Sequence, residues 1–295
     1  VYGFFLKIVI ADRLAIIVDE VFEGYLKYGT VELVLAAIAF SIQIYCDFGS
    51  YSLIAIGAAQ VMGFTLMENF NAPYFSISIK DFWHRWHISL STWFRDYLYI
   101  PLGGNRKGKI RKYLNIMLTF LCSGLWHGAA WNYVIWGGIH GAYQVIGDAF
   151  MPIRKRIVRC TKMKTECESF RITQMMVTFF LTTFAWIFFR ADSIAGAMGY
   201  ITRMCTRQNP WVFFDGSLYL LGVNQFDANV LFFALVILAI VDLIRYRKGM
   251  RIDTFLEKQN IWFRWLFIIV LLIMIGVYGA YGHEYNAKQF IYFQF

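Results

Sequence analysis

VLFFALVILAIVDLI, residues 230–244, and WLFIIVLLIMIGVYGAY, residues 265–281, are the stretches that decide the class of fold. The first stretch contains one charged residue, Asp242, and the second contains none. A helix that crosses the hydrocarbon core of a bilayer needs about 20 mostly apolar residues, and both stretches approach that length. The sequence therefore predicts an integral membrane protein with helical spans.

The composition of the whole chain agrees with this prediction. Its 295 residues are 59% hydrophobic, 19% aromatic and only 16% charged, whereas a soluble domain carries about 25% charged residues. The net charge of +9 lies mainly in three short connections between apolar stretches, residues 106–112, 154–171 and 245–251. Basic loops of this kind are typical of the cytosolic side. Because the aromatic residues lie in the apolar stretches and not in the basic loops, we expect membrane lipid, and no nucleic acid, as a partner.

Further apolar regions complete an all-α, multi-pass pattern. Residues 172–189 predict a span that leads away from the cytosolic loop, and residues 190–228 predict an external segment. Residues 114–149 hold two apolar stretches around a Trp-His-Gly-Ala sequence at 126–129, which predicts a helical hairpin that leaves and returns on one side. We therefore expect a polytopic transmembrane helical bundle.

The beginning of the chain is apolar but also charged. Residues 1–22 contain five charged side chains, which predicts either a short span or a helix at the membrane interface. There is no initiator Met. We expect residues 1–295 to form a single membrane-embedded region in the C-terminal part of a longer chain.

Asp47 lies between two apolar stretches, residues 31–45 and 53–64. A charge at such a position is costly unless it is paired or faces a water-filled cavity. Asp47 therefore indicates either a functional polar group or a break between two helices.

Residues 71–105 have a different composition, rich in Trp, His, Arg, Ser and Asp. This segment is too polar to face lipid and too aromatic for a free loop, which favours interfacial or re-entrant helices. Four of the five histidines follow closely, between positions 84 and 140. We expect residues 71–150 to form the catalytic core segment.

His127 is the most informative of these histidines. Thirteen residues after Leu114, it lies about 20 Å along a helix, inside a hydrocarbon core of about 30 Å. Burial disfavours the charged imidazole, and a neutral imidazole can act as a general base. The adjacent Gly124 and Gly128 leave space for a ligand. The alternative is a histidine that bonds a backbone carbonyl between packed helices.

The other histidines carry weaker signals. If residues 80–95 are helical, His84 and His87 share one face of the helix. Two histidines without a third ligand do not predict a metal site, and the five cysteines have no zinc-ribbon spacing, so we expect no metal. We expect His140 to be a packing residue and His283 to be exposed at the membrane interface.

Several sequence motifs of soluble catalysis are missing from the 295 residues. The chain contains no G-x-S-x-G elbow, H-E-x-x-H, P-loop or G-x-G-x-x-G sequence. This argues against hydrolases and nucleotide-driven pumps, and leaves a transporter possible.

Two segments resemble a known family. NAPYF at residues 71–75 and DFWHRWHISLSTWFRDYLYIPLGGNR at residues 81–106 are similar to the signature of the alginate O-acetyltransferase branch of the membrane-bound O-acyltransferases. GLWHGAAW at residues 124–131 resembles the segment that holds the catalytic histidine of that family, and FIYFQF at residues 290–295 resembles its C-terminus.

The resemblance implies a fold, an activity and a set of partners. It implies transfer of an acetyl group from a cytosolic thioester, acetyl-CoA, to hydroxyls of an exopolysaccharide or cell-wall glycan, with no bound cofactor. His127 would be the catalytic histidine and His87 its polar partner. It also implies a bacterial inner membrane and an extracytoplasmic partner acetyltransferase.

Three alternatives stay open at this point. Within the family, the chain could transfer D-alanyl groups to teichoic acid from a carrier protein. It could instead be a transporter or flippase in which Asp47 and His127 line the substrate path. As a scaffold without catalysis, it would recruit a partner through residues 190–228.

Overall fold

The computed structural model describes residues 1–281, and every regular element within them is a helix. Four of the described helices are long and apolar enough to cross a membrane: α3 (Thr30–Val61), α9 (Glu168–Arg190), α11 (Gln225–Lys248) and α13 (Ile261–Tyr278). The predicted all-α transmembrane class is confirmed. His283 and the motif at residues 290–295 lie outside the described residues.

The chain forms two compact units. The long-helix unit contains Val1–Ala72 and the chain from Met198 onward, and the hairpin unit contains Pro73–Ala197. The unit boundary near residue 72 coincides with the start of the polar and aromatic segment that the sequence singled out.

In the long-helix unit, the first residues form a helical run that packs along α3. This run consists of α1 (Tyr2–Phe5), the π-helical turn η1 (Leu6–Ala11) and α2 (Asp12–Glu23). Charged residues within this run form ion pairs. Arg13 is 5% exposed, and its Nε lies 3.1 Å from Asp227 Oδ1 on α11. The helical structure expected for residues 1–22 is therefore present, and three of its charged side chains, Lys7, Asp12 and Arg13, form ion pairs.

α3 is an uninterrupted helix of 32 residues, about 48 Å long at 1.5 Å per residue. The interpretation of Asp47 as a helix break is wrong, because Asp47 lies inside α3 and is 2% exposed. Lys7 Nζ lies 2.5 Å from Asp47 Oδ1 and 3.0 Å from Asp12 Oδ1. This ion pair satisfies the buried carboxylate and allows the helix to continue through it.

The N-terminus of α3 is held by side chains from two parts of the chain. The Glu32 carboxylate accepts a hydrogen bond from the backbone N–H of Gly29, the N-cap residue of α3. This bond satisfies a backbone donor at the start of the helix, where no intrahelical acceptor exists. Asn209 donates to Glu32 Oε2 at 2.6 Å and accepts from the Val31 N–H at 3.1 Å. The segment predicted to be external thus caps α3; it is built of α10 (Ile194–Thr206), η5 (Pro210–Phe213) and η6 (Ser217–Leu220).

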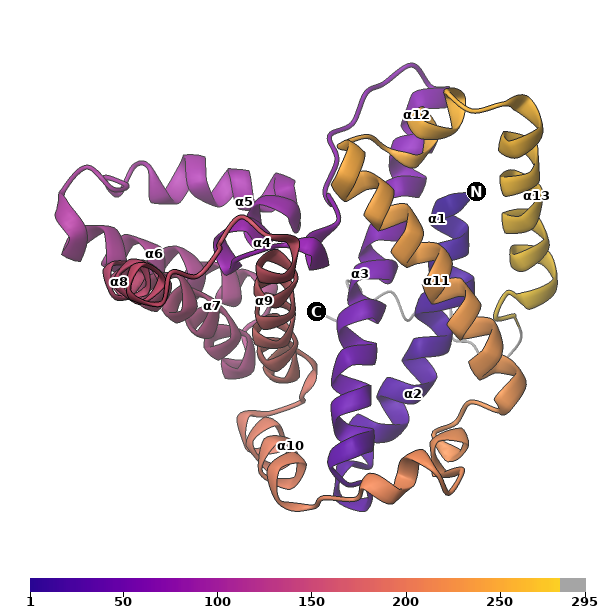
Figure 1. Ribbon diagram of the computed structural model, residues 1–295, viewed down its shortest axis with the longest axis horizontal. Helices are drawn as coiled ribbons and strands as arrows, with labels where there is room; N and C mark the ends of the chain where they lie inside the picture. Colours follow the sequence, from indigo (N-terminus) through magenta and orange to yellow (C-terminus); the bar gives the residue numbers. More distant parts are fainter. Residues whose placement is uncertain (282–295) are drawn as a thin grey trace. The chain divides into compact units, whose positions relative to one another are not determined.

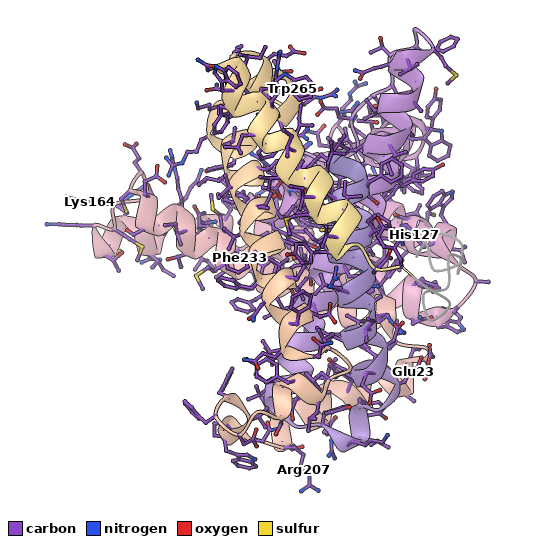
Figure 2. The ribbon with its side chains drawn as sticks, turned by 90° about the vertical axis from the view of Figure 1, so that its right-hand side faces the viewer. Glu23, His127, Lys164, Arg207, Phe233 and Trp265 are labelled. Atoms are coloured by element: carbon purple, nitrogen blue, oxygen red, sulfur yellow. The ribbon has the colours of Figure 1, made fainter. Side chains whose placement is uncertain are left out.

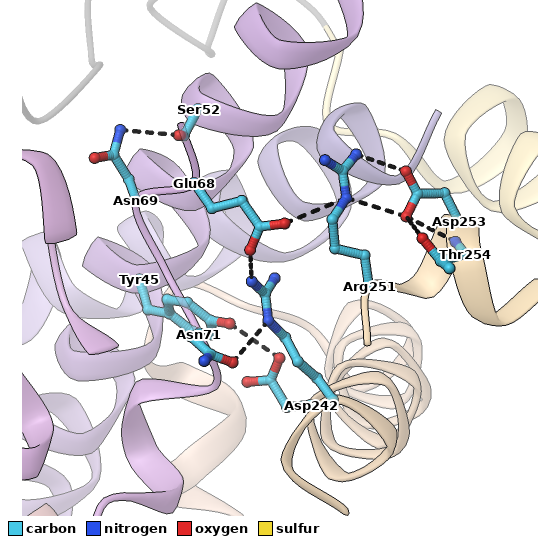
Figure 3. Close-up of polar contacts among 10 residues, drawn as sticks. Tyr45, Ser52, Glu68, Asn69, Asn71, Asp242, Arg251, Asp253 and Thr254 are labelled. Atoms are coloured by element: carbon cyan, nitrogen blue, oxygen red, sulfur yellow. Dashed lines mark hydrogen bonds and ion pairs between the residues drawn. The ribbon is translucent and has the colours of Figure 1, made fainter. Parts of the chain in front are cut away.

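The opposite end of this unit carries a network of ion pairs (Figure 3). The Arg245 guanidinium bonds the Glu68 carboxylate, and its Nε donates to Asn71 Oδ1 at 3.0 Å. Arg251 lies 3.5 Å from the other Glu68 oxygen and also pairs with Asp253 of α12 (Ile252–Glu257). Glu68 therefore joins the chain after α3 to the last turn of α11 and to the segment that follows α11.

α11 and α13 expose large apolar side chains along their length. Phe233 of α11 is 63% exposed and Trp265 of α13 is 53% exposed, and both are labelled in Figure 2. Contiguous exposed apolar surface is costly in water, whereas it is the expected surface of a helix in lipid. These helices have the outer face of a membrane protein.

The hairpin unit is built around α6 (Gly108–His127) and α7 (Trp131–Ala149), which lie side by side in Figure 1. A side chain at Gly124 would collide with the Tyr133 carbonyl, and one at Gly137 with the Phe120 carbonyl. Both glycines allow the two helix backbones to approach closely. The predicted hairpin over residues 114–149 is confirmed, with its turn at Gly128–Ala130.

Short elements cover one side of the hairpin. They are η3 (Pro73–Phe75), α4 (Ile79–Arg85), α5 (Ile88–Phe94) and the π-helical turn η4 (Arg95–Tyr99). α7 also packs against α9, and α8 (Met151–Thr161) follows α7 as an exposed basic helix. This arrangement brings α4, α6, α7 and α9 around the histidines.

Candidate active site

His87 occupies the junction between α4 and α5. Residues 80–95 do not form the one helix on which a shared face of His84 and His87 depends, because α4 ends at Arg85 and His87 adopts a left-handed backbone conformation with φ of 43°. His84 is exposed on α4, whereas His87 is 8% exposed at the N-cap of α5. The two histidines therefore do not share one helix face. A left-handed non-glycine residue carries backbone strain, which is common at functional sites.

His127 is the last residue of α6, and the helix ends at Gly128. The imidazole is 7% exposed and lies among aromatic rings contributed by three helices. Its ring centroid is 5.0 Å from that of Trp126, 5.1 Å from Trp136 on α7 and 5.4 Å from Phe189 on α9. The aromatic rings exclude water from a side chain that can take up and release a proton.

The two histidines predicted to act together lie near one another. Trp126 is in contact with both rings, with centroids 6.4 Å from His87 and 5.0 Å from His127. Burial, and to a smaller extent the nearby His127 imidazole, lower the pKa of His87 to about 3. Ser89 Oγ lies 3.4 Å from His87 Nδ1. His87 is therefore a neutral imidazole at physiological pH.

Comparison with known families shows which family the chain belongs to. Residues 1–191 match the membrane-bound O-acyltransferase family, which is well over half of the chain. The chain belongs to the membrane-bound O-acyltransferase family. The resemblance inferred from the two segments around His87 and His127 is confirmed.

Curated relatives of this membrane-bound O-acyltransferase act on different cell-surface polymers, according to their names. The chain is 46% identical over 198 residues to the probable alginate O-acetylase AlgI of Pseudomonas syringae, covering 66% of this chain and 36% of the relative. It is 37% identical over 202 residues to the peptidoglycan O-acetyltransferase of Helicobacter pylori, covering 68% and 37%. It is 36% identical over 124 residues to the teichoic acid D-alanyltransferase of Bacillus subtilis, covering 40% and 31%. The chain spans about a third of the length of these relatives.

His140 is the third buried histidine in this membrane-bound O-acyltransferase. It is fully buried on α7, as expected for a packing residue, and its ring lies 5.2 Å from that of Trp136. Trp83 Nε1 of α4 donates a hydrogen bond to His140 Nδ1 at 3.3 Å. The contact ties α4 to the hairpin.

The rings of Trp126, Trp136 and Phe189 around His127 form an aromatic wall. The sequence interpretation missed Trp136 and Phe189 as parts of this wall. Trp136 was part of an apolar stretch, and Phe189 part of a predicted span. A signal was available for Trp136, because it precedes His140 by four residues and so lies on the same face of a helix. No local signal places Phe189 beside His127, since the contact joins residues 62 positions apart on α6 and α9.

The ionisable residues do not assemble into a metal centre. Across residues 1–281, no group of three or more His, Cys, Asp or Glu side chains is placed to hold a metal ion. All five cysteines are free thiols. The titratable side chains that the structure places at the described site include the buried imidazoles of His87, His127 and His140.

Proposed function

We propose that this chain carries the catalytic histidine of an O-acetyltransferase in a bacterial inner membrane. The enzyme would move an acetyl group from a cytosolic thioester, acetyl-CoA, to a hydroxyl of an exopolysaccharide or cell-wall glycan. The acetyl group would reach the glycan directly or through an extracytoplasmic partner acetyltransferase. The observation that carries the proposal is the burial of His127 beside His87 inside an aromatic wall.

The chemistry follows from the state of the two imidazoles. His127, as a general base, removes the proton of the acceptor hydroxyl while the hydroxyl oxygen attacks the thioester carbonyl carbon. The tetrahedral intermediate then collapses, the carbon–sulfur bond breaks, and the thiolate receives the proton from His127. His87 would orient His127 and stabilise the charge that the proton transfer creates. The aromatic wall limits access of water, which would otherwise hydrolyse the thioester.

An acetyl group is favoured over D-alanine by the extent of similarity. The two O-acetylating relatives align over 198 and 202 residues, whereas the D-alanyltransferase aligns over 124. The identity of the glycan differs between the O-acetylating relatives, so the proposal names a class of acceptor and not one polymer.

The test uses the complete protein in its bacterial host. The O-acetyl content of extracted glycan is compared between wild type and His127→Ala at matched abundance in the membrane fraction. His84→Ala is the matched control, because His84 lies three residues from His87 but is exposed. We expect the acetyl esters to disappear with His127→Ala and to persist with His84→Ala.

Full acetylation by His127→Ala would overturn the proposal. Movement of a substrate across the membrane without a covalent acyl change would then favour the transporter alternative, and binding of a partner that survives the loss of His127 would favour the scaffold. Transfer of D-alanine in place of acetate would keep the role of His127 and correct the acyl group.

A further inference from the structure

Helix α7 carries two buried side-chain N–H groups close to His127 that no hydrogen bond within residues 1–281 uses. Trp136 and His140 lie one helical turn apart on α7 and are 1% and 0% exposed. Within residues 1–281, neither Trp136 Nε1 nor His140 Nε2 has a hydrogen-bond partner. Buried polar groups in folded proteins are nearly always hydrogen-bonded, so each exception asks for an explanation.

The bond from Trp83 decides which nitrogen of His140 carries the proton. An indole N–H can only donate, so His140 Nδ1, 3.3 Å away, must accept. In a neutral imidazole the other nitrogen then carries the hydrogen. His140 Nε2 is therefore a donor, and α7 presents two unused donors on one face.

Packing alone does not account for an indole at position 136. Trp136 stacks on Trp186 with ring centroids 5.3 Å apart and meets Phe189 at 5.0 Å. Phenylalanine would make contacts of the same kind without burying a donor. The presence of Trp136 indicates that something accepts its hydrogen bond when the site is in use.

The location of the two donors suggests what the acceptor is. The ring of Trp136 lies 5.1 Å from that of His127 and 5.2 Å from that of His140, so the indole is in contact with both the proposed general base and the ring of the second donor. A carbonyl oxygen has two lone pairs and no hydrogen, and it can accept from two N–H groups at once. A water molecule would also have to donate its own two hydrogens, in surroundings made mostly of aromatic carbon.

We propose that Trp136 Nε1–H and His140 Nε2–H bind the carbonyl oxygen of the acyl group that is transferred beside His127. The inference rests on the proposed acyl transfer and adds the group that receives the developing negative charge. When the acceptor oxygen attacks the carbonyl carbon, the C=O electron pair moves onto the bound oxygen, and the two donors stabilise that oxyanion. When the pair returns, the carbon–sulfur bond breaks and the thiolate takes the proton from His127.

The kinetic test replaces the N–H while keeping the shape of the ring. In the complete purified protein, Trp136 is replaced by benzothienylalanine, in which sulfur takes the place of the indole N–H, and in a second variant by phenylalanine. Transfer from acetyl-CoA to a sugar hydroxyl is then followed. Loss of one oxyanion donor typically lowers kcat by about 10²-fold, and we expect this loss with the KM for acetyl-CoA changed less than the kcat. Trp262, which is 81% exposed on α13, receives the same replacements as the control.

A spectroscopic test does not depend on turnover. A ketone analogue of acetyl-CoA, with CH₂ in place of sulfur and ¹³C at the carbonyl, is bound to the protein and its C=O stretch is recorded. We expect a shift to lower frequency in wild type that is reduced by benzothienylalanine at position 136 and unchanged by the same replacement at position 262. Wild-type kcat in the Trp136 variants, together with a carbonyl band that stays at the lowered wild-type frequency, would overturn the inference.

The outcomes separate this inference from the proposed function. If His127→Ala is inactive while both Trp136 variants keep wild-type kcat, acyl transfer stands and the carbonyl site is wrong. If His127→Ala is fully active, the proposed function itself is wrong, and the carbonyl site loses its basis.

Discussion

The two units of this protein bury polar groups in different ways. In the long-helix unit, buried charges have charged or polar partners: Asp47 has Lys7, Arg13 has Asp227, and Asp242 accepts from the Tyr45 hydroxyl at 2.9 Å. The neutral Tyr2 hydroxyl and Gln43 amide oxygen are the buried atoms of that unit that lack a partner within residues 1–281. In the hairpin unit, the buried groups around His127 are neutral rings from four helices.

This contrast separates stability from chemistry. Breaking a buried ion pair leaves an isolated charge in a medium of low polarity, which is strongly destabilising. A neutral imidazole or indole has no such dependence on one partner and can bind a ligand instead. We therefore expect substitutions in the long-helix unit to reduce stability and substitutions around His127 to reduce rate.

The largest expected effect is a loss of rate at His127. His127→Gln keeps a polar side chain of similar length but removes the base, and general-base catalysis contributes about 10²- to 10⁴-fold. We expect kcat to fall by that factor while the midpoint of thermal unfolding in detergent changes little. A large fall in this midpoint would mean that His127 stabilises the fold, and the proposed difference between the two units would then be wrong.

The opposite result is expected at Lys7. Lys7→Met leaves the buried Asp47 carboxylate without its ion pair and should lower the free energy of unfolding by about 3–5 kcal/mol. The rate per folded molecule should stay at the wild-type value. The double variant Lys7→Met, Asp47→Leu should recover much of the lost stability, as measured by thermal unfolding of the complete protein. If the single variant is as stable as wild type, the pair is not structural.

A smaller effect, dependent on pH, is expected at His87. Its pKa of about 3 in the fold lies below the value of about 6.5 expected for an unfolded chain. Between these values the unfolded chain binds more protons, so the contribution of His87 to stability is complete above pH 6.5 and is lost as the pH falls toward 3. At pH 5 the loss amounts to about 2 kcal/mol.

His87→Asn should remove this part of the acid sensitivity, since asparagine tolerates the left-handed backbone and does not titrate. The measurement is the difference between thermal midpoints at pH 7 and pH 5. His84→Asn, at an exposed position, should keep the wild-type difference. Equal acid sensitivity of wild type and His87→Asn would contradict the buried, neutral state of His87.

The smallest effect is expected in the network of Figure 3. Arg251 is a quarter exposed and shares Glu68 with Arg245, so that Glu68 keeps one partner when Arg251 is removed. Arg251→Gln should cost about 0–1 kcal/mol, and less at high salt. Thermal unfolding at low and high salt checks this, and a loss several times larger would mean that exposed and buried pairs of this unit act alike.

Hydropathy was sufficient to predict most of the long helices. α9, α11 and α13 overlap the predicted spans, and α6 and α7 form the predicted hairpin, because apolar length and its interruption by glycine are local properties. The continuity of α3 could not be predicted in this way. It depends on Lys7, which is 40 positions from Asp47 in the chain.

The candidate site was predicted only in part. His87 and His127 stand out because ionisable residues are rare in apolar sequence, and the structure brings them together. The backbone turn at His87 was missed, since the spacing of His84 and His87 fits one helix as well as two. The donors on α7 were missed because their lack of a partner is a property of the folded environment and not of the residue type.

The length of α3 links this protein to the thickness of its bilayer. A helix of about 48 Å exceeds a hydrocarbon core of about 30 Å, so it must tilt, extend beyond the core or thicken the surrounding lipid. Its C-terminal end is apolar and open, with Val61 90% exposed and Met62 67% exposed. Lipids with longer acyl chains would cover this end and let the helix stand more upright. The tilt of α3 is thus expected to depend on the lipid composition of the membrane. Reconstitution in bilayers of graded thickness would allow this dependence to be measured.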